Sequence, residues 1–207
     1  MCGIDRKRGE YQYKYLREDR IRGSALFKAI KPFLRANDIF LDINCGYSPM
    51  AEQILEHGYK ITGFDIHPEP IEYLKNEFPN GDWKQISYGS ILSHENIFSR
   101  KFTIVLLLGF SITSHGEKFL DHVERNIIVN QPRLIITEVY KKKEDFSTSY
   151  QKAYRDAVEL IKNHKYEVCA FGEHDAQIQV ASKRIYEIWE KDNMGDTNAQ
   201  AKHWVCV

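Results

Sequence analysis

Residues 40–49, FLDINCGYSP, place a carboxylate inside an apolar run and then interrupt regular structure at a glycine. Asp42 is flanked by Leu41 and Ile43, so the segment is predicted to form a buried strand with an acid near its end. A buried carboxylate without a partner costs several kcal/mol or takes up a proton. Asp42 is therefore expected to face a partner.

The residues after this strand favour a loop that approaches a ligand closely. Asn44 and Gly46 belong to the residue types that adopt left-handed backbone conformations most readily. Ser48 followed by Pro49 predicts an N-cap and the first residue of a helix. The free amides of that helix would then point toward the ligand.

The rest of the chain alternates between strand-like and helix-like patterns. Strands are predicted over residues 39–43, 60–64, 83–86, 102–108 and 133–139, and helices over 49–57, 70–78, 117–126 and 150–164. Two further strand-like runs, 166–171 and 184–189, have no helix between them and predict an antiparallel pair. This order predicts an α/β fold with a mostly parallel sheet and helices on both faces.

A second acid ends the next strand. Asp65, in KITGFDIHPE, lies 23 positions after Asp42, a spacing suited to binding a ribose diol. A dinucleotide site would need G-x-G-x-x-G for the pyrophosphate, whereas this loop reads N-C-G-Y-S-P. Asp42 would also repel phosphate. The pattern therefore favours a cationic nucleoside over NADH, and a nicotinamide dehydrogenase is the least favoured interpretation.

The two stretches FLDINCGYSP and ITGFDIHPE resemble the first two motifs of the class I S-adenosylmethionine-dependent methyltransferases. The resemblance spans about residues 36–190 and implies a three-layer Rossmann-like fold with a seven-stranded sheet. The family pattern has glycines where Asn44 and Ser48 stand, and often Asp where Ser90 and Thr103 stand.

The resemblance implies S-adenosylmethionine as cofactor. Asp42 would serve its ammonium group, Gly46 would line its amino-acid part, Asp65 would hold the ribose, and Ile66 would pack on the adenine. The full implied set is Asp42, Asn44, Cys45, Gly46, Tyr47, Asp65, Ile66, Ser90, Ile91, Leu107, Leu108 and Gly109. Three residues that follow or end strands on the same rim are the catalytic candidates: His115, Glu138 and Tyr140.

Composition indicates a soluble, cytosolic protein. Lys plus Arg and Asp plus Glu both number 29, which excludes a general attraction to nucleic acid or membranes. The four cysteines follow no disulfide or zinc spacing, no secretory signal is evident, and no metal is expected. Residues 1–35 are predicted to form a basic helical extension, residues 36–191 the cofactor-binding domain, and residues 192–207 a polar tail.

The expected activity is methyl transfer to an oxygen or nitrogen acceptor. A small molecule is the first choice of acceptor, and no N-P-P-Y follows the fourth strand as in adenine or glutamine methylation. RNA is the second choice, because residues 1–35 hold ten Lys or Arg against four acids and residues 6–35 would supply the contact. The alternative is a catalytically silent, nucleoside-binding interaction module.

Overall fold

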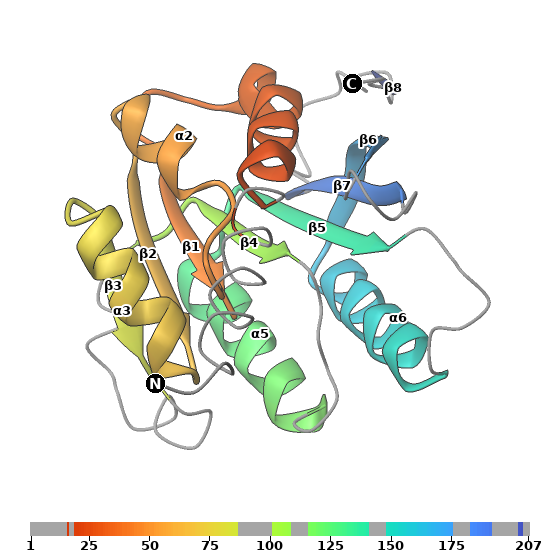
Figure 1. The fold of residues 1–207 in the computed structure, drawn as a ribbon. Coiled ribbons are helices and arrows are strands. Elements are labelled where there is room, and N and C mark those ends of the chain that lie inside the picture. Colours follow the sequence, from red (N-terminus) through yellow and green to blue (C-terminus); the bar gives the residue numbers. More distant parts are fainter. Residues whose placement is uncertain are drawn as a thin grey trace.

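The computed structural model describes residues 19–86, 101–108, 116–140, 148–175, 183–191 and 203–204, together with Leu16. The strands are β1 (Ile39–Ile43), β2 (Lys60–Asp65), β3 (Asp82–Gln85), β4 (Ile104–Leu108), β5 (Leu134–Tyr140), β6 (Tyr166–Asp175), β7 (Lys183–Lys191) and β8 (His203–Trp204). Within the described residues they form one sheet in the order β3-β2-β1-β4-β5-β7-β6-β8 (Figure 1). The five strands from β3 to β5 are parallel, and β7 is antiparallel to both β5 and β6.

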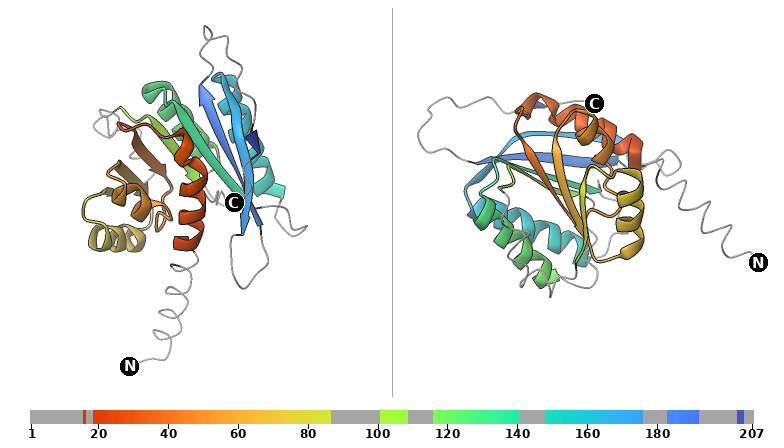
Figure 2. Two further views of the ribbon diagram at one scale, coloured as in Figure 1. Left: turned by 90° about the horizontal axis from the view of Figure 1, so that it is seen from above. Right: turned by 90° about the vertical axis from the view of Figure 1, so that its left-hand side faces the viewer.

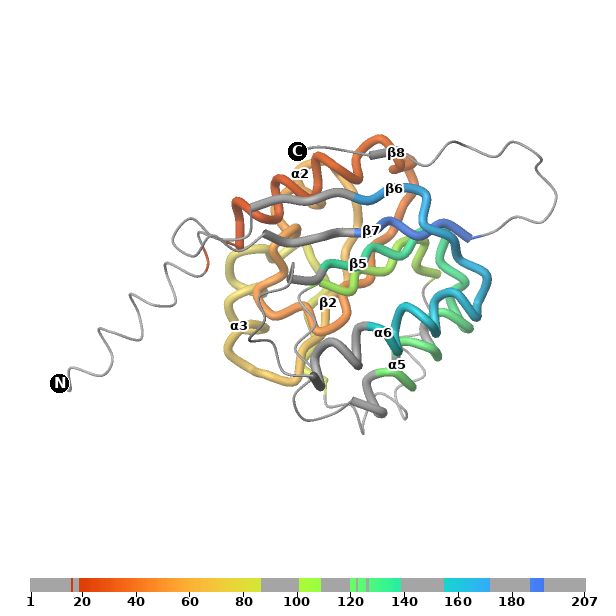
Figure 3. Tube along the Cα trace, turned by 90° about the vertical axis from the view of Figure 1, so that its right-hand side faces the viewer, coloured from red at the N-terminus to blue at the C-terminus, as the bar shows by residue number. Residues whose placement is uncertain are grey.

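Helices cover both faces of the sheet (Figure 2). The N-terminal helix (residues 19–30) is followed by a short 3₁₀ turn, η1 (Lys31–Phe33). The other helices are α2 (Ala51–Glu56), α3 (Pro68–Glu77), α5 (Gly116–Asn130) and α6 (Thr148–Asn163). The N-terminal helix, α2 and α3 pack on one face, and α5 and α6 pack on the other (Figure 3). We call these the first and the second face.

The core consists of one apolar cluster on each face. Alternation along β1 places Phe40 on the first face and Leu41 on the second. β4 is covered on both sides, so all five of its residues are buried, as the unbroken apolar run predicted. On the first face, Leu26 and Ile30 of the N-terminal helix are fully buried, which makes this helix part of the core.

The predicted mostly parallel sheet with its antiparallel pair and flanking helices is confirmed. Several boundaries differ from the prediction by one to four residues; α5, for example, ends at Asn130 and not at residue 126. α2 begins at Ala51, not at residue 49, and β6 continues to Asp175 beyond the apolar run. β8 pairs in parallel with β6 through only two residues of the predicted tail. The proposed division at residues 35 and 191 stays a prediction.

A partly buried polar network fixes the amino ends of the parallel strands, at the edge opposite to the two acids. The carboxylate of Asp38 accepts hydrogen bonds from Thr103 Oγ1 at 2.8 Å and from Arg133 Nη2 at 2.6 Å. The Ile39 amide donates to Thr103 Oγ1 at 2.9 Å. Thr103, which replaces an acid of the family pattern, therefore joins β1, β4 and β5 at their starts, away from the candidate site.

Candidate functional site

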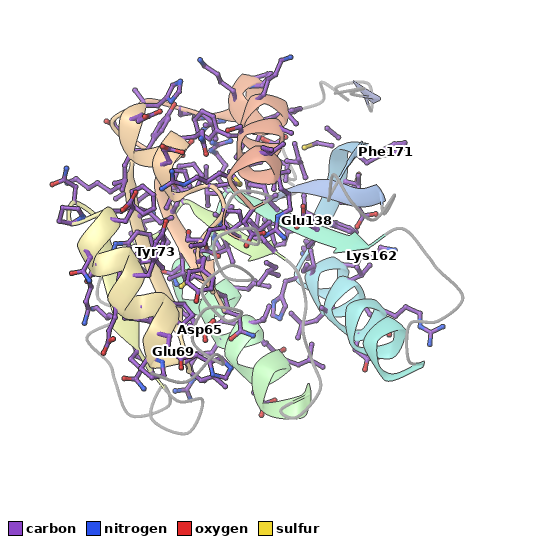
Figure 4. All side chains as sticks on the ribbon, in the orientation of Figure 1. Asp65, Glu69, Tyr73, Glu138, Lys162 and Phe171 are labelled. Carbon is purple, nitrogen blue, oxygen red and sulfur yellow. The ribbon has the colours of Figure 1, made fainter. Side chains whose placement is uncertain are left out.

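The three acids Asp42, Asp65 and Glu138 share the first face of the sheet. Phe40 on β1 and Ile61 on β2 point into the first-face cluster. Asp42 comes two residues after Phe40 and Asp65 four residues after Ile61, so both acids point to the same face as these core residues. Glu138 comes two residues after Ile136 of that cluster on β5, so it points to the same face. All three are buried, with Asp42 1% and Glu138 0% exposed. Figure 4 shows Asp65 at the end of β2 and Glu138 on β5.

The loop after β1 has a left-handed backbone at every second residue. The φ angles are +58° at Asn44, +49° at Gly46 and +45° at Ser48. These are the three positions where the methyltransferase pattern has glycines. Asn is one of the side chains that tolerate this conformation best, whereas Ser tolerates it less well. The loop therefore adopts a positive φ at all three of these positions with only one glycine.

Ser48 gives Asp42 a partner within the chain. Its hydroxyl donates to Asp42 Oδ2 at 2.6 Å, and Ser48 is 2% exposed. The prediction that Ser48 caps the following helix is wrong, because Met50 is the N-cap residue of α2 and the positive φ of Ser48 does not suit a cap. The serine instead stabilises the buried acid.

Asp65 joins the two loops that follow β1 and β2. Its Oδ2 accepts the Gly46 amide at 2.9 Å, and its Oδ1 accepts the His67 amide at 2.9 Å. The Cys45 amide donates to the Phe64 carbonyl at 3.0 Å, next to this contact. A carboxylate oxygen can accept more than one hydrogen bond, so Asp65 can hold the loops and still receive hydroxyl donors.

Burial raises the pKa values of two side chains in this region, Asp42 and Cys45. It raises the pKa of Asp42 to about 7, against the opposing effects of the Ser48 hydrogen bond and the Arg22 charge, while the charge of Asp65 adds to the rise. The pKa of the Cys45 thiol is raised well above its ordinary value by burial and then by the charges of Asp42 and Asp65. Cys45 therefore remains a thiol at neutral pH and is unsuited to act as a nucleophile.

The N-terminal helix packs directly against the loop after β1. A Cβ atom on Gly23 would lie 1.7 Å from the Pro49 carbonyl oxygen, so the backbones meet where only glycine fits. The helix is also held by Arg20, which donates to Glu77 Oε1 at 2.7 Å and to Tyr73 Oη at 3.2 Å on α3.

Arg22 reaches from this helix to the sheet. Its side chain is 6% exposed, its Nε lies 3.6 Å from Glu138 Oε2, and its Nη1 lies 3.2 Å from Asp19 Oδ1. Within the described residues, Asp42 forms no salt bridge with a lysine or arginine. Among the described residues, the hydrogen-bond partner of Asp42 is therefore a neutral hydroxyl and not a cation.

The other predicted site residues lie in different environments. Tyr47 packs edge-on against Tyr73 of α3, with ring centroids 5.3 Å apart. Leu108 is buried in the first-face cluster, whereas Leu107 belongs to the second-face cluster and Ile66 packs against it. Asn44 is half-buried on the loop. Their roles toward a cofactor stay predictions.

The catalytic candidates are only partly covered by the structure. Glu138 is fully buried and paired with Arg22, so it contributes to holding the N-terminal helix. Tyr140 is the last residue of β5. The predicted residues Ser90, Ile91, Gly109 and His115 lie outside the described residues.

Sequence reasoning missed three contributors: Ser48 as the partner of Asp42, and Arg22 and Gly23 on the N-terminal helix. A signal for Arg22 was present, because Arg22, Leu26 and Ile30 are spaced four apart and share one helix face. A glycine inside the same helix, at Gly23, is a second signal, since glycine there costs stability unless close packing requires it.

Comparisons with known proteins identify the fold. The chain has the Rossmann-like fold of the S-adenosylmethionine-dependent methyltransferases, which confirms the predicted fold class. No protein-family model and no curated protein sequence matches the chain.

Three solved structures illustrate the likeness. Magnesium protoporphyrin IX methyltransferase from Synechocystis PCC 6803, with bound S-adenosylhomocysteine, has a TM-score of 0.64 at 11% identity, covering 92% of this chain and 94% of that one. An S-adenosylmethionine-dependent methyltransferase from Methanosarcina mazei has a TM-score of 0.56 at 15% identity, covering 79% and 96%. A TehB-like methyltransferase from Corynebacterium glutamicum has a TM-score of 0.53 at 15% identity, covering 80% and 86%.

Membrane-spanning helices and metal centres are both absent from the described residues. None of their helices combines the length and apolar character that crossing a membrane requires. Among the same residues, no group of three or more His, Cys, Asp or Glu side chains is arranged to hold a metal ion.

Proposed function

We propose that this protein is an S-adenosylmethionine-dependent methyltransferase that acts on an oxygen or nitrogen acceptor. The observation that carries the proposal is the pair of buried acids, Asp42 and Asp65, on one sheet face beside a loop with alternating left-handed residues. The methyltransferase fold and the absence of a salt bridge at Asp42 within the described residues support it.

The residues of the site fit this cofactor better than a dinucleotide. A nucleoside needs an acceptor for its ribose hydroxyls, which Asp65 supplies at the carboxyl end of β2. A cationic amino-acid end needs a carboxylate, which Asp42 supplies. A pyrophosphate at the first loop would instead meet the negative side chain of Asp42, so dinucleotide binding is disfavoured.

Such a cofactor supplies a reactive sulfonium-bound methyl group. The chain's own contribution is to bind and align the two reactants, and alignment alone can lower a barrier by about 7–11 kcal/mol. Glu138, on the same face, is the described side chain best placed to take a proton from an acceptor.

A small molecule is the acceptor that the buried site favours. Asp42, Asp65 and Glu138 are all buried, so a folded macromolecule would have little room to reach them. An RNA acceptor would use the basic stretch of residues 6–35, of which the described part from Arg20 to Arg35 packs on the domain.

The proposal is tested by titrating the wild-type protein with S-adenosylmethionine, S-adenosylhomocysteine and NADH in a calorimeter. Both adenosyl ligands are expected to bind and NADH is not. Asp65→Ala is expected to weaken binding of the adenosyl ligands by about 10–100-fold, the equivalent of hydrogen bonds to a charged group. Asp82→Ala, at the opposite end of the neighbouring strand, is the matched control and should bind normally.

Three outcomes separate the interpretations. Failure of the wild-type protein to bind either adenosyl ligand would refute the proposal. Binding followed by methyl transfer from labelled cofactor to a pool of amines, alcohols or RNA would support it and identify the acceptor class. Binding without turnover on any pool would favour the silent interaction module.

A further inference from the structure

Arg22 has an environment that a surface arginine of an amphipathic helix does not have. Among the residues whose side chains are described, it is the only buried lysine or arginine. Burying a guanidinium is costly, so its position needs compensation by nearby acids. Asp19 and Glu138 provide part of it, at 3.2 Å and 3.6 Å.

The acids around Arg22 outnumber it. Within the described residues, four buried carboxylates, those of Asp19, Asp42, Asp65 and Glu138, belong to this helix and to the ends of β1, β2 and β5. The Arg22 guanidinium lies close to two of them, Asp19 and Glu138. Gly23, the neighbour of Arg22, lies against Pro49, and Ser48, the neighbour of Pro49, donates a hydrogen bond to Asp42, so the helix meets the loop beside this acid. The Arg22 charge also opposes the rise that burial causes in the pKa of Asp42. The described groups thus present an acid and a base side by side on the first face.

This juxtaposition matches the chemistry of an α-amino acid. Such a group carries an ammonium and a carboxylate on one carbon, so a protein recognises it with one acid and one base held close together. A guanidinium is suited to the carboxylate, because its planar fork of five N–H donors can serve several oxygens at once. Adding a zwitterion leaves the charge of the cluster unchanged, and the sulfonium adds one compensating positive charge.

We propose that Arg22 binds the α-carboxylate of the cofactor's amino-acid end while Asp42 binds its ammonium group, so that the N-terminal helix completes the cofactor site. The proposal rests on the methyltransferase function proposed above. The close contact of Gly23 with Pro49 fixes the helix on the loop, and the contact with Glu138 orients the guanidinium. Arg22 is then a binding residue and Glu138 its positioning partner.

The test compares ligands that possess or lack the carboxylate. Wild-type protein is expected to bind S-adenosylhomocysteine at least about tenfold more tightly than 5′-methylthioadenosine, which lacks the amino acid, because charge-assisted hydrogen bonds are lost. Decarboxylated S-adenosylmethionine is expected to bind about tenfold more weakly than S-adenosylmethionine. This second comparison needs no variant. Equal affinity for the members of either pair would overturn the proposal.

Arg22→Gln is expected to weaken S-adenosylhomocysteine binding about tenfold and to leave 5′-methylthioadenosine binding within about twofold. Lys28→Gln is the matched control on the same helix, since Lys28 is exposed, and both affinities should be retained. If Arg22→Gln weakens both ligands equally, Arg22 has a structural role only and the proposal fails.

Two further measurements distinguish a folding defect, a failure of the proposed function and a failure of the role proposed for Arg22. Removing one member of a buried ion pair can prevent folding, so Arg22→Gln combined with Glu138→Gln, which removes both charges and keeps the shapes, is measured alongside. The double variant should show the same selective loss. If wild-type protein binds none of the adenosyl ligands, the proposed function itself fails, whereas normal wild-type binding without selective loss refutes only the role of Arg22.

Discussion

Gly23→Ala is expected to destabilise the protein by about 3 kcal/mol, although the same change stabilises an ordinary helix interior by up to about 1 kcal/mol. The added Cβ would lie 1.7 Å from the Pro49 carbonyl oxygen and 2.3 Å from the carbonyl carbon. Those atoms belong to the backbone and cannot rotate away as a flexible side chain can. The N-terminal helix or the loop must therefore shift.

The same shift should affect ligand binding. Moving the helix away from the loop would withdraw Arg22 from the sheet and expose Asp42, so S-adenosylhomocysteine is expected to bind at least about tenfold more weakly, since a charged contact is lost. Urea unfolding measures the first effect and calorimetry the second. Ser24→Ala is the control, because Ser24 is exposed and its hydroxyl accepts an exposed hydrogen bond from the Gln53 amide at 2.9 Å.

Ser24→Ala should change the free energy of unfolding by less than about 0.5 kcal/mol, as surface substitutions usually do. The close contact between the helix and the loop would be contradicted if Gly23→Ala raised stability as in a free helix. Retained stability together with weakened binding would indicate that the helix moves without loss of core packing.

Most of the fold could be predicted because its signals are local. The apolar run that became β4 is buried on both faces, and its unbroken composition indicates such a strand from sequence alone. The alternation of strand and helix patterns predicted the parallel sheet, and the missing helix between the last two long strands predicted their antiparallel pairing. These features depend on neighbours in the chain.

The boundaries that were missed depend on contacts that local patterns do not contain. The end of β6, Gly172 to Asp175, carries no apolar signal, but its backbone pairs with β7 up to Asp175↔Lys183. Backbone pairing needs no apolar side chains, so a composition argument stops too early. The start of α2 was missed for a related reason, since Ser48 adopts a positive φ while its hydroxyl contacts Asp42.

In the candidate site, too, the features with local sequence signals could be predicted and the long-range contacts could not. The two acids and the left-handed positions Asn44 and Gly46 could be predicted, because strand ends and turn residues have sequence signatures. The contact of Arg22 with Glu138 joins residues that are far apart in the chain, and only the folded sheet brings them together. Such pairs have no spacing rule that a single sequence reveals.

Asp42 is expected to make stability fall as pH rises from about 4 to about 7. Burial raises its pKa in the folded protein to about 7, from an ordinary value of 3.8. In this window the unfolded chain has lost the proton and the folded protein retains it, so the folded state binds more protons and raising the pH favours unfolding. The loss of folding free energy caused by Asp42 reaches up to about 4 kcal/mol and does not grow further above pH 7.

The measurement is the difference between wild type and Asp42→Asn in urea unfolding from pH 4 to pH 8. The amide oxygen of asparagine can still accept the Ser48 hydroxyl, so the variant removes the titration and keeps the contact. The variant is expected to gain stability relative to wild type as pH rises. A difference that stays constant with pH would show that Asp42 does not titrate in this range.

Ser48→Ala should extend the pH-dependent fall in stability to higher pH. The Ser48 hydrogen bond lowers the pKa of Asp42, so its loss is expected to move the end of the stability change above pH 7. Asp42→Asn combined with Ser48→Ala should lack this shift. If Ser48→Ala alone leaves the pH at which the stability change ends unaltered, the Ser48 hydroxyl does not control the protonation of Asp42.

The same carboxyl should couple cofactor binding to proton release. A cationic amino group favours ionised Asp42, so below pH 7 binding must expel the proton that burial retains. The affinity for S-adenosylmethionine is therefore expected to rise by up to about tenfold per pH unit toward pH 7 and then level off, a dependence that Asp42→Asn should lack. Calorimetry at pH 6 in two buffers of different ionisation enthalpy counts the protons directly. Binding by the wild type with no released proton would mean that the cation does not contact Asp42.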